Sequence, residues 1–388
     1  MQEKRKPGIV SRTHIRLRDN GPHLDKNGLD LANRCRNALR CTFAPKVRGK
    51  GIVLVTCMWV WLLGSFAACS YAQPVKDTGN FISYTDKILI KTNFSTQTDK
   101  YILKENNSTS LKLQPNNEYR MFLSLDYEFI GFSYGFSPKI LGANDDNDRK
   151  GKSSFTDYKF LLFLGQWLQT VEYSRIKGYY VENTADFVPG WQKGTDPYIQ
   201  INNLTNTQWA MSTAYIVNRN FSFKNLVYQT EWQKKSAGSL VPVVSYDYNR
   251  YSFDFSGNRS VQKDFNLRLG LGYYYTFIIG NRFFVSPNLQ PSLGVRFSSY
   301  SSVENGITTG EHKNYFTRFV EGGIKMGFNT PRLVAGAGFN FNVNWYNEDK
   351  SSVSQNDKLF GILYFGYRFG APRILTDTYS KISKKLGL

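Results

Sequence analysis

Cysteine and histidine are nearly absent from most of this 388-residue chain. All four cysteines precede Gln73, and only one of the three histidines, His312, follows it. The chain beyond residue 72 therefore offers neither a disulfide framework nor a cysteine-based metal site. A Ser–His catalytic constellation also has a single candidate base there, in the sequence GEHKN, and we expect that loop histidine to be merely solvated.

Motifs for nucleotide and metal chemistry are also missing. The sequence holds no P-loop and no H-E-x-x-H motif. The acidic run DDND at 145–148 resembles a calcium-ligand cluster, but it lacks the glycine and terminal glutamate of a calcium loop. Of the net charge of +19, the chain beyond residue 72 carries +10, from 36 Lys+Arg and 26 Asp+Glu. These basic residues are dispersed, so they suit anionic lipid better than nucleic acid. We expect no enzyme active site, no cofactor, no metal and no nucleic-acid partner.

A single long apolar run lies near the start of the chain. It reads GIVLVTCMWVWLLGSFAA over residues 51–68, carries no charge and follows three basic residues between positions 46 and 50. A basic n-region, an apolar h-region and a small-x-small site form a secretory signal peptide. The tripeptide SYA before Gln73 completes that pattern, so we predict a signal peptide at 51–72, cut after Ala72.

Two other interpretations of this region stay open. The box FAAC would allow cleavage before Cys69 and lipidation of that cysteine, and the run is about long enough for a membrane-spanning helix. The residues before the run are many for an n-region and show no sustained apolar period. We interpret residues 1–50 as a non-structural extension, with the true translation start near Val47.

Beyond the leader, apolar and polar residues alternate over long stretches. In DFNLRLGLGYYYTF (264–277) every odd position is apolar or aromatic, and the even positions are Asp, Asn, Arg, Gly, Gly, Tyr and Thr. The pattern returns at 283–297, where only Phe284 interrupts it, and at 333–345. Successive side chains of a strand point to opposite faces, so each stretch has one apolar and one polar face.

The length of these stretches favours membrane-spanning strands over a soluble β-sandwich. Strands of globular proteins are usually about five or six residues long, whereas a tilted strand needs roughly nine to eleven residues to cross a bilayer. A closed barrel satisfies every backbone group in lipid, and the 25 Tyr and 29 Phe suit its aromatic girdles. We predict an all-β fold, a transmembrane antiparallel β-barrel of about twelve strands (range 10–14), over residues 73–375.

Strands are counted back from a last strand that ends on the periplasmic side. The segment FSFKNLVYQTEW (221–232) is left out, because counting it would move every earlier long loop to the periplasm. We expect it to be helical or plug-like. The strands are then 86–95, 117–128, 130–137, 157–166, 169–181, 207–218, 238–248, 264–278, 282–300, 314–328, 332–346 and 357–369.

Charged residues fall on the strand faces that point into the predicted barrel. Opposite charges inside a narrow barrel usually pair and fill it, and a path for a solute is the alternative. The expected lumen-facing charges are Arg120, Asp126, Glu128, Arg268, Arg282, Arg296, Glu321, Lys325 and Arg368.

Three stretches resemble a known family. FSFKNLVYQTEWQKKSAGS (221–239), YTDKILIKTNFS (84–95) and YRFGAP (367–372) are similar to domain of unknown function 4421, a Bacteroidota family of envelope β-proteins. The resemblance implies a fold and a compartment but no activity. The run QKKSAGS (233–239) is the most specific part of the resemblance. The segment around it is expected to form a structural hairpin or turn, a lumenal plug or a partner-docking element, and its residues of interest are Glu231, Gln233, Lys234, Lys235, Ser236 and Gly238.

These observations favour a structural or partner-binding barrel in the outer membrane of a Gram-negative, Bacteroidota-like bacterium. A passive channel or lipid conduit is one alternative, and a lipid-modifying barrel enzyme is another. The expected partners are outer-membrane lipid and lipopolysaccharide, the barrel-assembly machinery and another envelope protein. The basic tail, residues 376–388, is expected to rest on the inner leaflet or to plug the base.

Overall fold

The computed structural model describes residues 76–386, except 98, 105–109, 256–257, 305–306, 347–351 and 356–357. The predictions for the extension at 1–50, the signal peptide at 51–72 and Cys69 lie outside the described residues. Of the helices that the structure describes, none has the length and apolar character needed to cross a bilayer.

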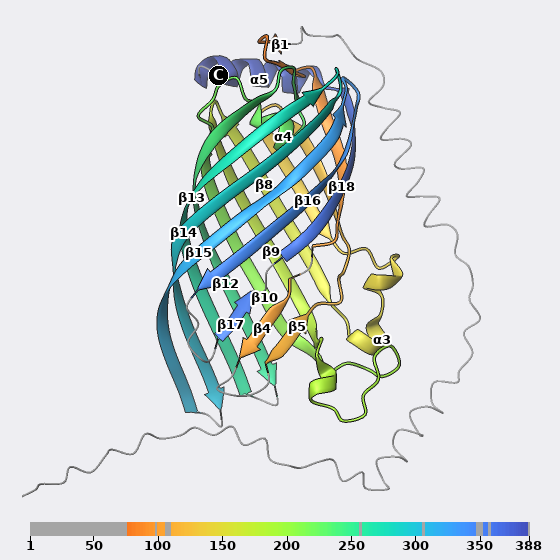
Figure 1. Ribbon diagram of the computed structural model, residues 1–388, viewed down its shortest axis with the longest axis vertical. Helices are drawn as coiled ribbons and strands as arrows, with labels where there is room; N and C mark the ends of the chain where they lie inside the picture. Colours follow the sequence, from red (N-terminus) through yellow and green to blue (C-terminus); the bar gives the residue numbers. More distant parts are fainter. Residues whose placement is uncertain are drawn as a thin grey trace, which may run out of the picture. The chain divides into compact units, whose positions relative to one another are not determined.

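Twelve strands form a closed antiparallel barrel (Figure 1). Each strand pairs with the next along the ring, and the ring closes where the last strand, β18, pairs with the first, β3. The all-β fold and the strand number are therefore as predicted. The strands are β3 (Lys87–Ser95), β6 (Arg120–Tyr127), β7 (Ile130–Phe136), β8 (Ser154–Leu164), β9 (Trp167–Val181), β10 (Gln200–Tyr215), β12 (Ala237–Phe255), β13 (Asn258–Ile279), β14 (Phe283–Glu304), β15 (Ile307–Asn329), β16 (Leu333–Tyr346) and β18 (Lys358–Gly370).

The two ends of the barrel differ in their connections. Short turns join the strands at the upper end of Figure 1, for example between β6 and β7 and between β13 and β14. At the lower end long segments join β3 to β6, β7 to β8, β9 to β10 and β16 to β18, and β4 (Tyr101–Lys104), β5 (Leu111–Gln114) and β17 (Ser352–Gln355) add to the sheet there. Barrels of the outer membrane have short periplasmic turns and long external loops, so we assign the upper end to the periplasm.

The strand ranges predicted above leave residues 249–263 and 301–313 between strands, as external loops, but the described residues of both segments are strand. They belong to the hairpins β12–β13 and β14–β15, whose pairing continues to the partners Phe255–Asn258 and Glu304–Ile307. The prediction ended these strands too early because it stopped at the limit of the apolar face. Backbone pairing continues beyond that limit through residues with mostly polar side chains, so the hairpins project past the apolar band.

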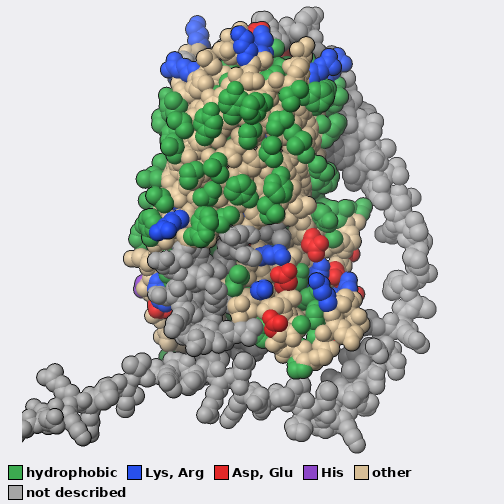
Figure 2. Space-filling model, in the orientation of Figure 1, with side chains coloured by type: hydrophobic (Ala, Val, Ile, Leu, Met, Phe, Trp, Pro, Cys, Tyr) green, Lys and Arg blue, Asp and Glu red, His purple; other side chains and the backbone are tan. Residues whose placement is uncertain are grey.

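Apolar side chains cover the outer wall of the barrel. Figure 2 shows them as a band between two ends that carry the charged side chains. On β13 and β14, Leu269 and Leu293 are opposite each other and more than half exposed, while their neighbours Arg268 and Arg296 lie on the inner face. Phe284, which interrupts the alternation, is buried inside the barrel. The wall thus has the lipid-facing and lumen-facing sides of a membrane barrel.

The assignment of the two ends can be tested by labelling single cysteines. Lys234, near the short turns, and Asp148, in α3 (Asn147–Lys150) at the opposite end, are both exposed. All four native cysteines precede Gln73, so the exported chain is expected to hold none. In intact cells an impermeant maleimide should label Asp148→Cys and spare Lys234→Cys. Labelling of both positions, or of Lys234→Cys alone, would show that the assignment is wrong.

Candidate functional site

A plug fills the periplasmic end of the barrel. It is the connection between β10 and β12, residues 216–236, which forms the short helix α4 (Phe223–Val227) and the strand β11 (Glu231–Gln233). The Ser222 hydroxyl caps α4 by accepting from the backbone N–H of Asn225 at 3.0 Å. β11 pairs with β2 (Phe81–Ser83), which pairs with β1 (Lys76–Asp77), and these three strands form a sheet of their own. The segment is not a barrel strand. This was predicted from the sidedness of the loops, because counting the segment as a strand would have moved every earlier long loop to the periplasm.

The plug packs against the inner wall through apolar side chains. Phe223, Leu226, Tyr228 and Trp232 of the plug are buried with inward-facing wall residues, among them Phe284. The phenylalanine that breaks the alternation of β14 thus contacts the plug, with its ring centroid 6.5 Å from that of Trp232.

A glycine on β7 makes room for this packing. A Cβ atom on Gly131 would stand 2.3 Å from the ring of Tyr228, which is far too close for a side chain there. The ring of Tyr228 therefore packs directly against the backbone of β7.

Lysines of the wall bind the plug where α4 ends. Lys325 donates to the carbonyl of Leu226 at 2.5 Å, and Lys91 donates to the side chain of Gln229 at 2.7 Å. Lys91 is also paired with Asp126, at 3.5 Å. The last carbonyls of a helix have no partner within the helix, and these cations supply donors to the carbonyls of Leu226 and, from Lys91 at 3.4 Å, of Val227.

Arg368 on β18 joins the plug to the barrel at a second point. Its guanidinium donates to the carbonyl of Gln229 and to the side chain of Asn329 at 2.7 Å, and it lies 4.2 Å from the centroid of the Tyr84 ring. Asn329 in turn donates to Asn225 of α4 at 3.1 Å. The plug is therefore held by hydrogen bonds from three wall strands, β3, β15 and β18.

The residues of the family-specific run all lie in or beside the plug. Glu231 and Gln233 are buried, and Gln233 accepts from the backbone N–H of Ser222 at 2.6 Å. Lys234 pairs with Asp77 of β1 at 2.9 Å, Lys235 is exposed, and Ser236 accepts from the backbone N–H of Ile278. A Cβ on Gly238 would be 2.5 Å from the ring of Tyr275. The run shapes the plug and its return to the wall.

The middle of the lumen is polar and accessible to solvent. Arg268 pairs with Asp247 at 2.7 Å, and Lys159 pairs with Glu172 at 2.6 Å. The side chain of Lys159 points inward from β8 yet is 38% exposed, so it borders space that water can enter. We call this part of the lumen the polar chamber.

A buried ion network lies at the external end of the chamber. Arg120 donates to Asp99 at 2.8 Å, and Lys358, distant in sequence, binds the other oxygen of the same carboxylate. The guanidinium of Arg120 stacks on Phe155, 4.0 Å from the ring centroid. Burial alone would raise the pKa of Asp99, but the two cations hold it well below its ordinary value.

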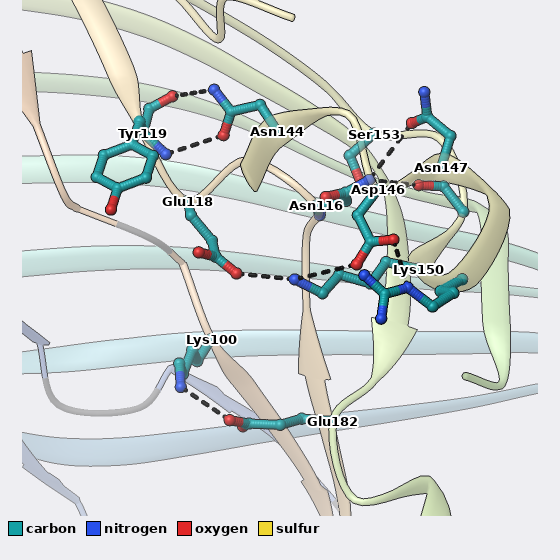
Figure 3. A network of polar contacts seen from close by, with 12 residues as sticks. Lys100, Asn116, Glu118, Tyr119, Asn144, Asp146, Asn147, Lys150, Ser153 and Glu182 are labelled. Atoms are coloured by element: carbon teal, nitrogen blue, oxygen red, sulfur yellow. Dashed lines mark hydrogen bonds and ion pairs between the residues drawn. The ribbon is translucent and has the colours of Figure 1, made fainter. Parts of the chain in front are cut away.

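Polar contacts also connect the external loops to one another. Asn144 of η2 (Gly142–Asn144) bonds both backbone groups of Tyr119, and Lys150 pairs with Glu118 at 2.8 Å (Figure 3). The exposed pair Lys100–Glu182 joins a further two segments at 3.1 Å. The loop between β7 and β8 is thereby fixed to the chain that precedes β6.

The structure places eight of the nine expected lumen charges inside the barrel. Seven of them project inward from strands, and Glu128 is buried at the turn between β6 and β7. The prediction was wrong for Arg282, because β13 ends at Ile279 and the chain turns before β14, which leaves Arg282 exposed. Sequence reasoning missed six charged residues that form ion pairs inside the barrel: Lys91, Asp99, Lys159, Glu172, Asp247 and Lys358.

Residues with catalytic or metal-binding chemistry lie apart from one another. His312 is exposed on β15, and the spacing G-x-S-x-G of GFSYG (131–135) falls within strand β7, not on a strand-to-helix turn. Among the described residues, no group of three His, Cys, Asp or Glu side chains could hold a metal ion. The acidic run at 145–148 spans the end of η2 and α3, where Asp146 pairs with Arg149 at 2.8 Å.

Comparison with known proteins identifies the family of the chain. The barrel is similar to the β domain of the Bordetella autotransporter BrkA (10% identity, 74% of this chain and 100% of that one, TM-score 0.35). It is similar to LpxR from Salmonella typhimurium (9%, 72% and 99%, 0.31) and to outer-membrane OmpT of Vibrio cholerae (8%, 76% and 99%, 0.28). No curated protein matches. Residues 75–369 match one family model, and the chain belongs to that family, Domain of unknown function (DUF4421).

Proposed function

We propose that this protein is a closed outer-membrane barrel of a Gram-negative, Bacteroidota-like envelope, with a structural or partner-binding role and no enzymatic activity. The observation that carries the proposal is the plug. Its apolar side chains are buried against the wall, and Lys91, Lys325 and Arg368 bind the end of α4 from three strands. Both ends of the plug continue covalently into the wall strands β10 and β12. The plug therefore stays in the lumen and closes it without any bound ligand.

The paired charges of the lumen support a structural role for the interior. Arg268 pairs with Asp247, Lys159 pairs with Glu172, and Gln290 donates to Glu321 at 2.6 Å. Side chains that satisfy one another in this way fill and stiffen a barrel. The polar chamber favours the second candidate, a channel that opens when the plug moves, because it already admits water.

The periplasmic end also offers a surface for lipid and partners. The helix α5 (Arg373–Leu386) lies across this end in Figure 1, and its Tyr379 stacks on Phe129 with ring centroids 5.7 Å apart. It leaves Ile374 and Ile382 exposed beside four basic residues, Arg373, Lys381, Lys384 and Lys385. An exposed apolar face bordered by basic residues suits the anionic inner leaflet. We propose that α5 rests on that leaflet, with lipopolysaccharide and the assembly machinery as the other envelope partners.

Conductance in planar bilayers tests the closed state. The wild-type barrel should give no stable ionic current. Replacing residues 220–233 by a four-residue Gly-Ser linker should open steady currents, because it removes α4 and β11 and leaves the polar chamber open to the periplasm. The matched control is Lys235→Ala, which changes an exposed residue at the end of the plug and should stay closed.

Two results would contradict this proposal. Steady currents through the wild-type barrel would show that the plug does not close it. A plug-deleted barrel that folds but remains silent would show that another element closes the lumen.

A further inference from the structure

A cavity with aromatic walls opens at the periplasmic end of the barrel. Its volume is about 220 Å³, and it lies where the plug, two strand turns and α5 meet. The rings of Phe129, Phe163, Phe221, Phe223 and Tyr379 line it. Exposed residues at its edge, among them Gly165 and Arg219, indicate that it is open to the periplasmic side. The space suits one long side chain or a small organic ion.

Two carboxylates, Glu128 and Glu231, and two cations, Lys224 and Arg219, line this cavity. Glu231 accepts from the Ser222 hydroxyl at 2.5 Å and pairs with Lys224 at 3.4 Å, so both of its oxygens have partners. Arg219 donates to Gln166 at the edge, at 2.8 Å. Glu128 remains, and within the described part of the chain it makes no ion pair. Glu128 is thus the buried carboxylate of this lining that no cation pairs with directly.

Glu128 is held in an unfavourable position. Its backbone φ is +47°, a left-handed conformation that glycine adopts far more readily, and its side chain is only 2% exposed. Two hydroxyls meet the carboxylate, Ser83 at 3.4 Å and Tyr379, and burial raises the pKa of Glu128 although Lys224 opposes the rise. A strained residue with a buried carboxylate of this kind is a mark of a functional site.

We propose that this cavity binds a primary alkylammonium group, with the ammonium at Glu128 and the alkyl chain against the aromatic rings. A cation gains from the faces of aromatic rings as well as from a carboxylate in a site of low polarity. The cavity accepts the side chain of a lysine on a periplasmic protein or a free alkylamine, which share this chemistry. The inference deepens the partner-binding role proposed above by naming what the periplasmic end recognises.

Binding to the full barrel in detergent or nanodiscs tests the proposal. The probes are acetyl-Gly-Lys-Gly-amide, the same peptide with uncharged norleucine, and n-butylammonium, each titrated by calorimetry or ligand-observed NMR. The lysine peptide and n-butylammonium should bind, and the norleucine peptide should bind about tenfold more weakly or not at all. Tighter binding of the lysine peptide than of n-butylammonium assigns the site to a protein side chain, and the reverse order assigns it to a free amine.

Two substitutions at one position keep the test decisive. Glu128→Gln removes the charge with little change of shape, and Glu128→Gly also relieves the left-handed backbone, so the second variant should fold at least as readily. Both should bind the cationic probes about tenfold more weakly or not at all, whereas Glu182→Gln at the external end should bind like wild type. Equal binding of lysine and norleucine peptides, absence of binding by either cation, or full affinity in both Glu128 variants would overturn the proposal.

The result of the amine-binding test can be distinguished from the result of the conductance test. Glu128 makes no contact with the wall cations that hold α4, so both variants should remain silent in planar bilayers. Loss of amine binding with a closed barrel reports on the cavity, and currents without loss of amine binding report on the plug.

Discussion

Asp99→Asn is expected to lower the free energy of unfolding of the barrel by about 3–5 kcal/mol. The substitution removes the carboxylate that Arg120 and Lys358 share, and the side chains of all three residues are at most 13% exposed. It would leave two buried cations facing each other without an anion, and their desolvation would no longer be offset. Urea unfolding in detergent, followed by the fluorescence of the five tryptophans that follow Ala72, measures the change.

The matched control is an exposed ion pair at the same end of the barrel. Glu182 pairs with Lys100 at 3.1 Å, and both side chains are more than one third exposed, so Glu182→Gln should cost at most about 1 kcal/mol. Equal losses in the two variants would contradict the assignment of Asp99 as the centre of a buried network.

Acid should weaken this network only at low pH. The pKa of Asp99 is lower in the folded protein than in the unfolded chain, because two cations outweigh its burial. The stabilisation is therefore complete at pH values above the ordinary aspartate pKa of about 3.9 and declines as the pH falls below it.

Much of the barrel could be predicted from the sequence because successive side chains of each strand face two different environments in turn. Lipid outside and a polar lumen inside sort side chains with period two, so Leu269 and Arg268 could be assigned to opposite faces from sequence alone. Phe284 broke the pattern, and the structure gives the reason, since this inward position faces the apolar plug and not the polar chamber. A break in alternation was thus a signal of a contact within the lumen.

The partners inside the lumen could not be predicted in this way. Lys358 and Asp99 are 259 residues apart, and nothing local in either segment indicates that they meet. The plug was expected from loop parity, yet its attachment depends on wall residues such as Lys91 and on the space at Gly131, which only the closed ring brings together. Arg282 shows the related limit at strand ends, where alternation no longer determines direction.

Leu271→Arg is expected to destabilise the barrel by about 2–4 kcal/mol and to impair its assembly in the membrane. The apolar face of β13 extends from Phe265 to Ile279, and Leu271 stands near its centre with 51% of its surface exposed to the lipid. A cation at the middle of the bilayer loses its hydration, and an arginine at this depth is too far from either interface to recover it fully.

Arg268→Leu on the same strand provides the comparison, because it makes the opposite change on the opposite face. Asp247 would lose its cation but keep two amide donors, Asn249 at 2.6 Å and Asn266 at 2.7 Å. The side chain of Arg268 is one quarter exposed to the chamber, so water can replace part of its interaction with the buried Asp247, and we expect a loss of about 1–2 kcal/mol. Heat-modifiable gel mobility reports assembly in cells, and urea unfolding reports stability. If the two variants assembled equally well, the assigned register of β13 would be wrong. If only Leu271→Arg failed to assemble, the result would confirm that the odd-numbered side chains of this strand face lipid and the even-numbered ones face the lumen.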